Sequence, residues 1–280
     1  MQDDRGSRKT SRRRWWGRLT TRAPALVALG LGLACRPESE GAPPPPPPPP
    51  GRFIASYGPA EPEFEDFRAG LQANRFLDTV AARLNGDYVL PANITLATGH
   101  CDDPNASYEP TTRRVTLCYE LFSYLSDQFA HEQMGPELIG GTLVFALAHE
   151  LAHALIDVLQ IPTTGREEDA ADQLATLLLL NQGTAGDTLA FGAVAWFAEN
   201  AQSRTVDTLS FADDHAFDLQ RFYNVMCWVY GRDPTRYPDL VSEEWLPAHR
   251  ASRCQTEYAR IAENWGRLLL PHRRTPDREG

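Results

Sequence analysis

The sequence predicts an α+β protein in which strands precede a mostly helical C-terminal half. Two segments, 88–97 and 113–119, alternate apolar and polar side chains as strands do, whereas the chain after residue 137 carries apolar residues at helical spacing. Early strands and late helices are typical of α+β folds rather than of alternating α/β folds. The length of 280 residues allows one domain of this kind or two small ones.

Residues 1–35 have the composition of an export signal with a lipid-attachment site. An arginine-rich start precedes the uncharged apolar run 23–34, which is too short to span a bilayer comfortably. Residues 11–16 loosely match a twin-arginine signal, and Sec export fits equally well. Cys35 follows Leu-Gly-Leu-Ala, which resembles a bacterial lipobox. We therefore expect lipidation of Cys35 and a cell-envelope or periplasmic location, with ordinary cleavage near Ala34 as the alternative.

The rest of the chain divides into a linker, a domain and a tail. Residues 36–60 form a Pro-rich linker in which residues 43–50 are all proline, and such a tract is an extended polyproline II spacer. A spacer of this kind is useful when one end is tethered to a membrane. Residues 61–270 are expected to fold as the domain, and residues 271–280 are expected to be a disordered tail.

The first half of the domain should contain the strands. A helix is expected over residues 61–84, ended by the Asn-Gly-Asp sequence that follows it. The strands at 88–97 and 113–119 should form a long hairpin around the turn-rich segment 101–112. A short helix over 120–129 closes this half.

The second half should be helical. The longest helix is expected from Glu137 to Leu159, where Pro162 stops it. Further helices are expected at residues 166–181, 189–200, 214–230 and 248–269.

The remaining cysteines are Cys101, Cys118, Cys227 and Cys254, an even number in a chain with an export signal. We expect the disulfides Cys101–Cys118 and Cys227–Cys254, because each pair brackets a short local segment. The alternative is a structural zinc site made of all four thiolates, although the C-x-x-C spacing usual in such sites is absent from the sequence.

The charge of the chain limits its partners. The formal net charge is −10. Because residues 1–34 are strongly basic, the remainder of the chain is more acidic still. An acidic body argues against nucleic acid and against anionic lipid as partners. Membrane contact is therefore expected only through the lipid anchor.

The most informative motif is H-E-x-x-H at residues 149–153, inside the longest predicted helix. His149 and His153 lie one turn apart on one helix face and can share a metal ion, with Glu150 beside the open coordination position. A metzincin would also need Gly at position 156 and His at position 159. These positions hold Ile156 and Leu159, which excludes that class.

A third ligand can come from the next helix. Thr164 with Glu167 fits a capping box, which would occupy Glu167 and leave Glu168 free to bind metal. Asp172 lies four residues after Glu168, on the same face, and can accept a hydrogen bond from a ligand histidine. Small alanines at 170 and 171 would let the two helices approach closely.

The sequence H-E-x-x-H followed by E-x-x-A-D resembles the gluzincin zinc metallopeptidases. The stretches 148–155 and 165–174 are also similar to an uncharacterised bacterial metallopeptidase family, and the likeness extends over about residues 60–265. The resemblance implies one catalytic Zn²⁺ bound by His149, His153 and Glu168, with Glu150 as general base and Asp172 behind the ligands. It also implies a zincin-like fold, in which a small antiparallel sheet packs on the active-site helix.

In that fold an edge strand lines the cleft and pairs with an extended peptide substrate. We expect residues 113–119 to be this edge. A peptidase also needs a donor for the oxyanion of the tetrahedral intermediate. His215 is the best candidate, with Asp218 as its orienting partner. Tyr223 and Arg221 are alternatives, for which packing or a buried ion pair is the simpler interpretation.

These features predict zinc-dependent hydrolysis of a peptide or protein substrate in the cell envelope. Two alternatives remain at this point. One is an envelope lipoprotein that binds zinc without catalysis, and the other is a zinc hydrolase that acts on a non-peptide substrate.

Overall fold

The computed structural model describes residues 49–203 and 211–274. The predicted export signal, the lipidation site Cys35 and most of the proline tract lie outside these described residues, as do residues 275–280 of the predicted tail.

Four short strands form one sheet in the order β1-β2-β4-β3. The strands are β1 (Phe53–Tyr57), β2 (Ile94–Gly99), β3 (Ala106–Glu109) and β4 (Arg114–Cys118). Strands β1, β2 and β4 are parallel, and β3 pairs antiparallel with β4. The sheet is therefore mixed, and the prediction of an antiparallel sheet is wrong.

The predicted hairpin of residues 88–97 and 113–119 is also wrong. The strands within these segments, β2 and β4, run in the same direction, with Ala97 opposite Thr116. The hairpin is instead formed by β3 and β4, and β3 lies in the segment expected to be a loop. Strand β1 was not predicted either, since Phe53–Tyr57 lies in the expected linker.

The C-terminal half is mostly helical, which confirms the α+β prediction. The helices are α1 (Glu65–Ala73), α2 (Phe76–Asp87), α3 (Tyr119–Gln128), α4 (Gly135–Val158), α5 (Glu167–Leu180), α6 (Thr184–Ser203), α7 (Asp218–Arg232), α8 (Asp239–Ser242) and α9 (Ala248–Leu269). The single helix expected over 61–84 is broken into α1 and α2 at Arg75, whose φ of 51° is left-handed. Helix α7 begins only at Asp218, later than expected.

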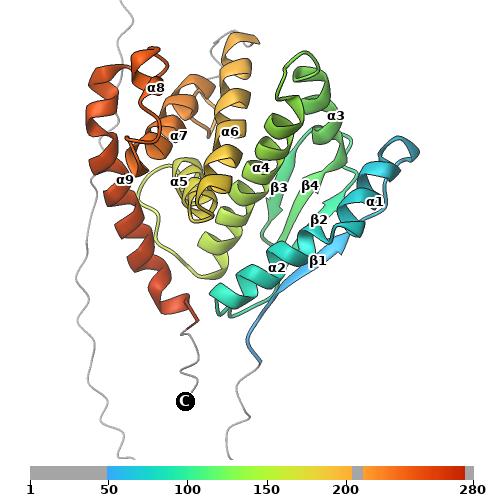
Figure 1. Cartoon of the computed structure of the whole chain (residues 1–280). Coiled ribbons are helices and arrows are strands. Elements are labelled where there is room, and N and C mark those ends of the chain that lie inside the picture. Colours follow the sequence, from blue (N-terminus) through green and yellow to red (C-terminus); the bar gives the residue numbers. More distant parts are fainter. Residues whose placement is uncertain (1–48, 204–210, 275–280) are drawn as a thin grey trace, which may run out of the picture. The chain divides into compact units, whose positions relative to one another are not determined.

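Helix α4 lies at the centre of the domain, between the sheet and the C-terminal helices (Figure 1). It is apolar on most of its circumference because it packs on both sides: Leu151 and Leu155 join the core against the sheet, and Phe145 joins the core formed with α6 and α7. By length and composition α4 could cross a membrane, with a mean hydropathy of 1.5. However, 72% of that apolar stretch is buried inside the protein, as in a core helix.

Both predicted disulfides are present. Cys101–Cys118 joins the loop after β2 to the end of β4, and Cys227–Cys254 joins α7 to α9. Pairing of all four sulfurs excludes the alternative of a four-thiolate zinc site. Two disulfides indicate an extracytoplasmic protein, because cytosolic thiols are kept reduced.

Candidate metal centre

Three side chains from α4 and α5 meet at one point. The Nε2 atoms of His149 and His153 lie 3.2 Å apart, since the two residues are one helical turn apart. Glu168, in the first turn of α5, places its Oε2 atom 3.0 Å from the His149 nitrogen and 3.3 Å from the His153 nitrogen. Ala171 is fully buried between the helices and keeps α5 close to α4.

The separations of these three atoms fit a tetrahedral metal ion. Zinc bonds of about 2.0–2.1 Å at tetrahedral angles place ligand atoms about 3.3 Å apart. The observed triangle of 3.0, 3.2 and 3.3 Å matches that requirement. Two imidazoles and one carboxylate are also the ligand types of catalytic zinc sites that keep one position open. The residues present therefore fit a metal ion.

Each histidine is oriented by its own carboxylate. The Nδ1–H of His149 donates to Asp172 at 2.9 Å, and the Nδ1–H of His153 donates to Glu167 at 2.8 Å. A carboxylate only accepts, so these bonds place the proton on Nδ1 and leave both Nε2 lone pairs for a metal.

The capping role expected for Glu167 is wrong. Helix α5 begins at Glu167, with Arg166 as its N-cap and no side-chain capping bond, so Thr164 does not cap it. The carboxylate of Glu167 points to His153 instead, a role that the sequence analysis missed. The adjacent glutamate pair 167–168 in front of Asp172 was the signal that could have indicated it.

The pKa values show that the centre stabilises positive charge. Burial alone would lower the pKa of His149, but its hydrogen bonds to Asp172 and Glu168 raise it to about 9. Burial would raise the pKa of Glu168, yet hydrogen bonds from three histidines hold it well below its usual range. The same set of acceptors that favours protons on the imidazoles favours a cation at their meeting point.

Arg221, from α7, extends this network. Its Nε and Nη2 atoms donate to the two oxygens of Asp172 at 2.8 and 2.7 Å, and its guanidinium lies 4.3 Å from the centre of the Phe197 ring. Arg221 lines the cavity but forms a buried ion pair. Tyr223 packs against Phe222 and is not among the residues that line the cavity.

His215 reaches the centre from the segment before α7. Its Nε2 atom lies 2.8 Å from Oε2 of Glu168, and its ring stacks on that of His149 with centroids 5.8 Å apart. Its Nδ1 atom lies 3.2 Å from Asp213, rather than from the expected Asp218. The contact with Glu168 raises the pKa of His215. His149, Glu168 and His215 thus form a second possible ligand set, with donor atoms within 4.8 Å of one another.

The centre opens into a cavity of about 900 Å³ that runs along α4. Strand β3 lines it, whereas β4 lies inside the sheet between β2 and β3, so the expectation that residues 113–119 form the cleft edge is wrong. The Tyr108 backbone N–H donates to the carboxylate of Glu150, whose pKa is raised by burial. The Tyr108 hydroxyl donates to Asp157 on α4 at 2.6 Å and so fastens β3 to this helix.

Residues 57–269 match the family model described as "Putative metallopeptidase". No curated protein and no solved structure matches the chain.

Proposed function

The chain belongs to this putative metallopeptidase family, and on that basis we propose that it hydrolyses peptide bonds with a zinc-activated water. His149, His153 and Glu168 would hold the ion. The observation that carries the proposal is the triangle of their donor atoms, with sides of 3.0–3.3 Å. We place the enzyme in the cell envelope, anchored through Cys35, in accord with the disulfides and the lipobox.

The bound ion would lower the pKa of a water to about 7 and would polarise the substrate carbonyl. Glu150 would accept a proton from the attacking water and would pass it to the leaving amine. Its carboxyl is suited to this exchange because burial raises its pKa, while the Tyr108 N–H keeps it oriented. Asp172 and Glu167 hold the two imidazoles in the tautomer that binds the ion.

We assign the stabilisation of the oxyanion to His215. Its Nε2 atom lies 2.8 Å from Oε2 of Glu168, which supports this assignment because the ring lies beside a proposed ligand of the ion. Asp213 orients the ring from the opposite nitrogen. Arg221 is not assigned this task, because its guanidinium is paired with Asp172.

The decisive test is the variant Glu150→Gln. Without the base, hydrolysis of a mixed peptide library should fall by about 10²–10⁴-fold, while zinc content remains that of the unmodified protein. Glu137→Gln is the matched control, since Glu137 is an exposed residue of the same helix that does not line the cavity. Undiminished hydrolysis by Glu150→Gln would contradict the assignment of the base.

The contact between His215 and Glu168 supports one alternative, a closed zinc site without catalysis. If His215 were a fourth ligand, the protein would bind zinc and fail to bind a hydroxamate, which needs open coordination positions. The proposed peptidase binds the hydroxamate in competition with peptide. Calorimetric titration of the zinc-loaded protein separates the two.

A further inference from the structure

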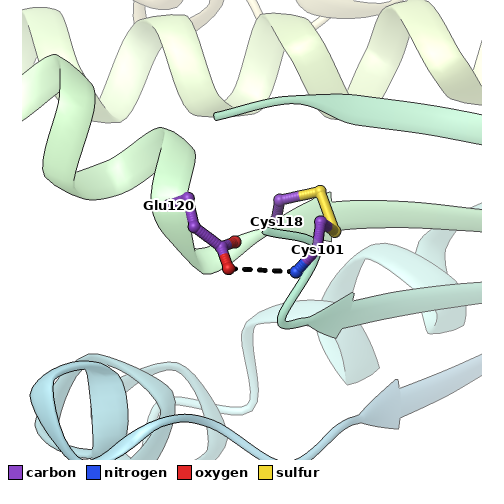
Figure 2. Close-up of side chains that lie close together, drawn as sticks. All are labelled: Cys101, Cys118 and Glu120. Atoms are coloured by element: carbon purple, nitrogen blue, oxygen red, sulfur yellow. Dashed lines mark hydrogen bonds between the residues drawn. A yellow bond between two sulfur atoms is a disulfide. The ribbon is translucent and has the colours of Figure 1, made fainter. Parts of the chain in front are cut away.

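A second group of metal-binding side chains lies where β2 and β4 end and α3 begins. It consists of His100, Cys101, Cys118 and Glu120. Glu120 extends beside the Cys101–Cys118 disulfide and accepts a hydrogen bond from the Cys101 backbone N–H at 3.0 Å (Figure 2). None of these side chains belongs to the centre on α4.

Only one of the two carboxylate oxygens of Glu120 has hydrogen-bond partners among the described residues. Its Oε1 atom accepts the backbone N–H groups of Cys101 and Asp102, at 3.0 and 3.2 Å, and contacts Nδ1 of His100. Its Oε2 atom is buried and has no hydrogen-bond partner among the described residues. A buried carboxylate oxygen without a protein partner is costly, and a bound cation would satisfy it.

The two sulfurs and a Glu120 oxygen are close enough to share a cation, since they lie within 4.8 Å of one another. His100 lies beside this group: its Nδ1 atom contacts the same carboxylate, and its Nε2 atom lies 2.8 Å from Asp102. Thiolate, imidazole and carboxylate are all zinc ligands. A surface pocket of about 540 Å³, lined in part by Gly99, His100 and Cys101, provides an entry path for an ion.

We propose that this cluster is a redox-dependent zinc site, formed when the Cys101–Cys118 disulfide is reduced. A dithiol reductant would break the S–S bond, becoming a disulfide itself and leaving two protonated thiols. Zinc binding then releases both thiol protons and forms two Zn–S bonds, with Glu120 and His100 as the other ligands. The disulfide and the zinc site are thus two alternative cross-links between the start of the β2–β3 connection and the end of β4.

The site is tested by cobalt binding to the full chain. Two thiolates on Co²⁺ give a strong charge-transfer absorption in the near ultraviolet, whereas the nitrogen and oxygen ligands of the α4 centre give none. We expect this band with the phosphine-reduced protein and its absence in the oxidised protein. The result does not depend on whether the protein is a peptidase. Absence of the band after reduction would overturn the proposal.

Three variants assign the ligands. Cys101→Ser with Cys118→Ser should abolish the band while leaving Cys227 and Cys254, a pair beside which the cationic Arg250 lies, 4.0 Å from the Cys254 sulfur. Glu120→Gln and His100→Ala leave both cysteines in place, so they test the other two ligands in the reduced protein. Each should weaken cobalt binding by more than about tenfold, since even groups behind the ligands contribute that much. Unchanged affinity in either variant would reject the four-ligand site.

Discussion

Glu167 and Asp172, from the first and second turns of α5, hold the two histidines of the metal centre. Each carboxylate accepts an Nδ1–H, at 2.8 Å from His153 and at 2.9 Å from His149. The two differ in burial, because the Asp172 side chain is 6% exposed and that of Glu167 is 48% exposed. Solvent competes for the Glu167 bond, so Asp172 should contribute more to the orientation of its histidine.

The half-exposed Glu167 should still contribute measurably to metal affinity. For Glu167→Ala we expect zinc affinity to fall by about 10–100-fold, because His153 loses the acceptor that fixes its tautomer. Competition with a chromophoric chelator measures the affinity. Asp169→Ala is the control, as a nearby carboxylate of the same helix that does not line the cavity. Equal losses in the two variants would show that general charge, rather than the bond to His153, sets the affinity.

Asp172 should make stability depend on pH at the acid end. Burial would raise its pKa, but Arg221 and the hydrogen bond from His149 lower it from 3.8 to about 2. The ionised form is therefore favoured in the folded state. This contribution is fully present above about pH 4, and about 2 kcal/mol is lost as pH falls towards 2.

Urea unfolding of the metal-free protein between pH 5 and 2 tests this expectation. The unfolding free energy of the unmodified protein should fall more steeply than that of Asp172→Asn, whose side chain does not titrate. Parallel pH profiles for the two proteins would show that Asp172 has no lowered pKa in the folded state.

Among the elements, the helices were predicted better than the strands. Helix α9 has the expected bounds, and α4 and α5 differ from expectation by a residue or two at each end. Their apolar periodicity is a local signal, and it is strong because each helix packs on a core. The H-E-x-x-H spacing has the same local character, and this is why the pair of histidines could be placed on one face from the sequence.

Strand direction could not be predicted in the same way. Whether β2 and β4 run parallel depends on the path of the chain between them, and β3 is a strand of only four residues with two exposed side chains. The role of Glu167 was predicted wrongly for a related reason. A T-x-x-E pattern shows which capping bond is possible, whereas the competing donor, the Nδ1–H of His153, is supplied by another helix.

Helices α4 and α6 cross at a close backbone contact between two glycines. Gly141 and Gly192 meet backbone to backbone, and a Cβ on Gly141 would lie 2.8 Å from the Leu189 carbonyl oxygen. We expect Gly141→Ala to destabilise the protein by about 1–3 kcal/mol through overpacking. Gly140→Ala is the control: a Cβ there meets nothing within 4 Å, so it should stabilise α4 by about 0.5–1 kcal/mol. Thermal unfolding of both variants measures the difference, and a neutral Gly141→Ala would show that the helices can separate without cost.

Several acidic side chains line the cavity. Its lining includes the carboxylates of Glu150, Asp157, Glu167 and Glu168. Among the described residues of the lining, Arg221 is the single arginine, and it is paired with Asp172. A bound divalent ion offsets only part of this charge. The net charge of the chain, −10, has the same sign, so the field at the cavity mouth should attract cationic peptides.

Substrate charge and salt should therefore act together on the proposed hydrolysis. With two peptides that differ only in a lysine or a glutamate remote from the cleaved bond, we expect the lysine peptide to have the higher kcat/KM at low salt. Raising the ionic strength from about 0.01 M to about 0.15 M shortens the Debye length from about 30 Å to about 8 Å, so the difference between the peptides should shrink. The effect should be carried by KM rather than kcat, because steering acts before the bond is cleaved. A preference for the lysine peptide that persists unchanged in high salt would instead indicate a direct short-range contact within the cavity. Asp157 would be the candidate for this contact, because it is the α4 carboxylate of the lining that lies further from His149.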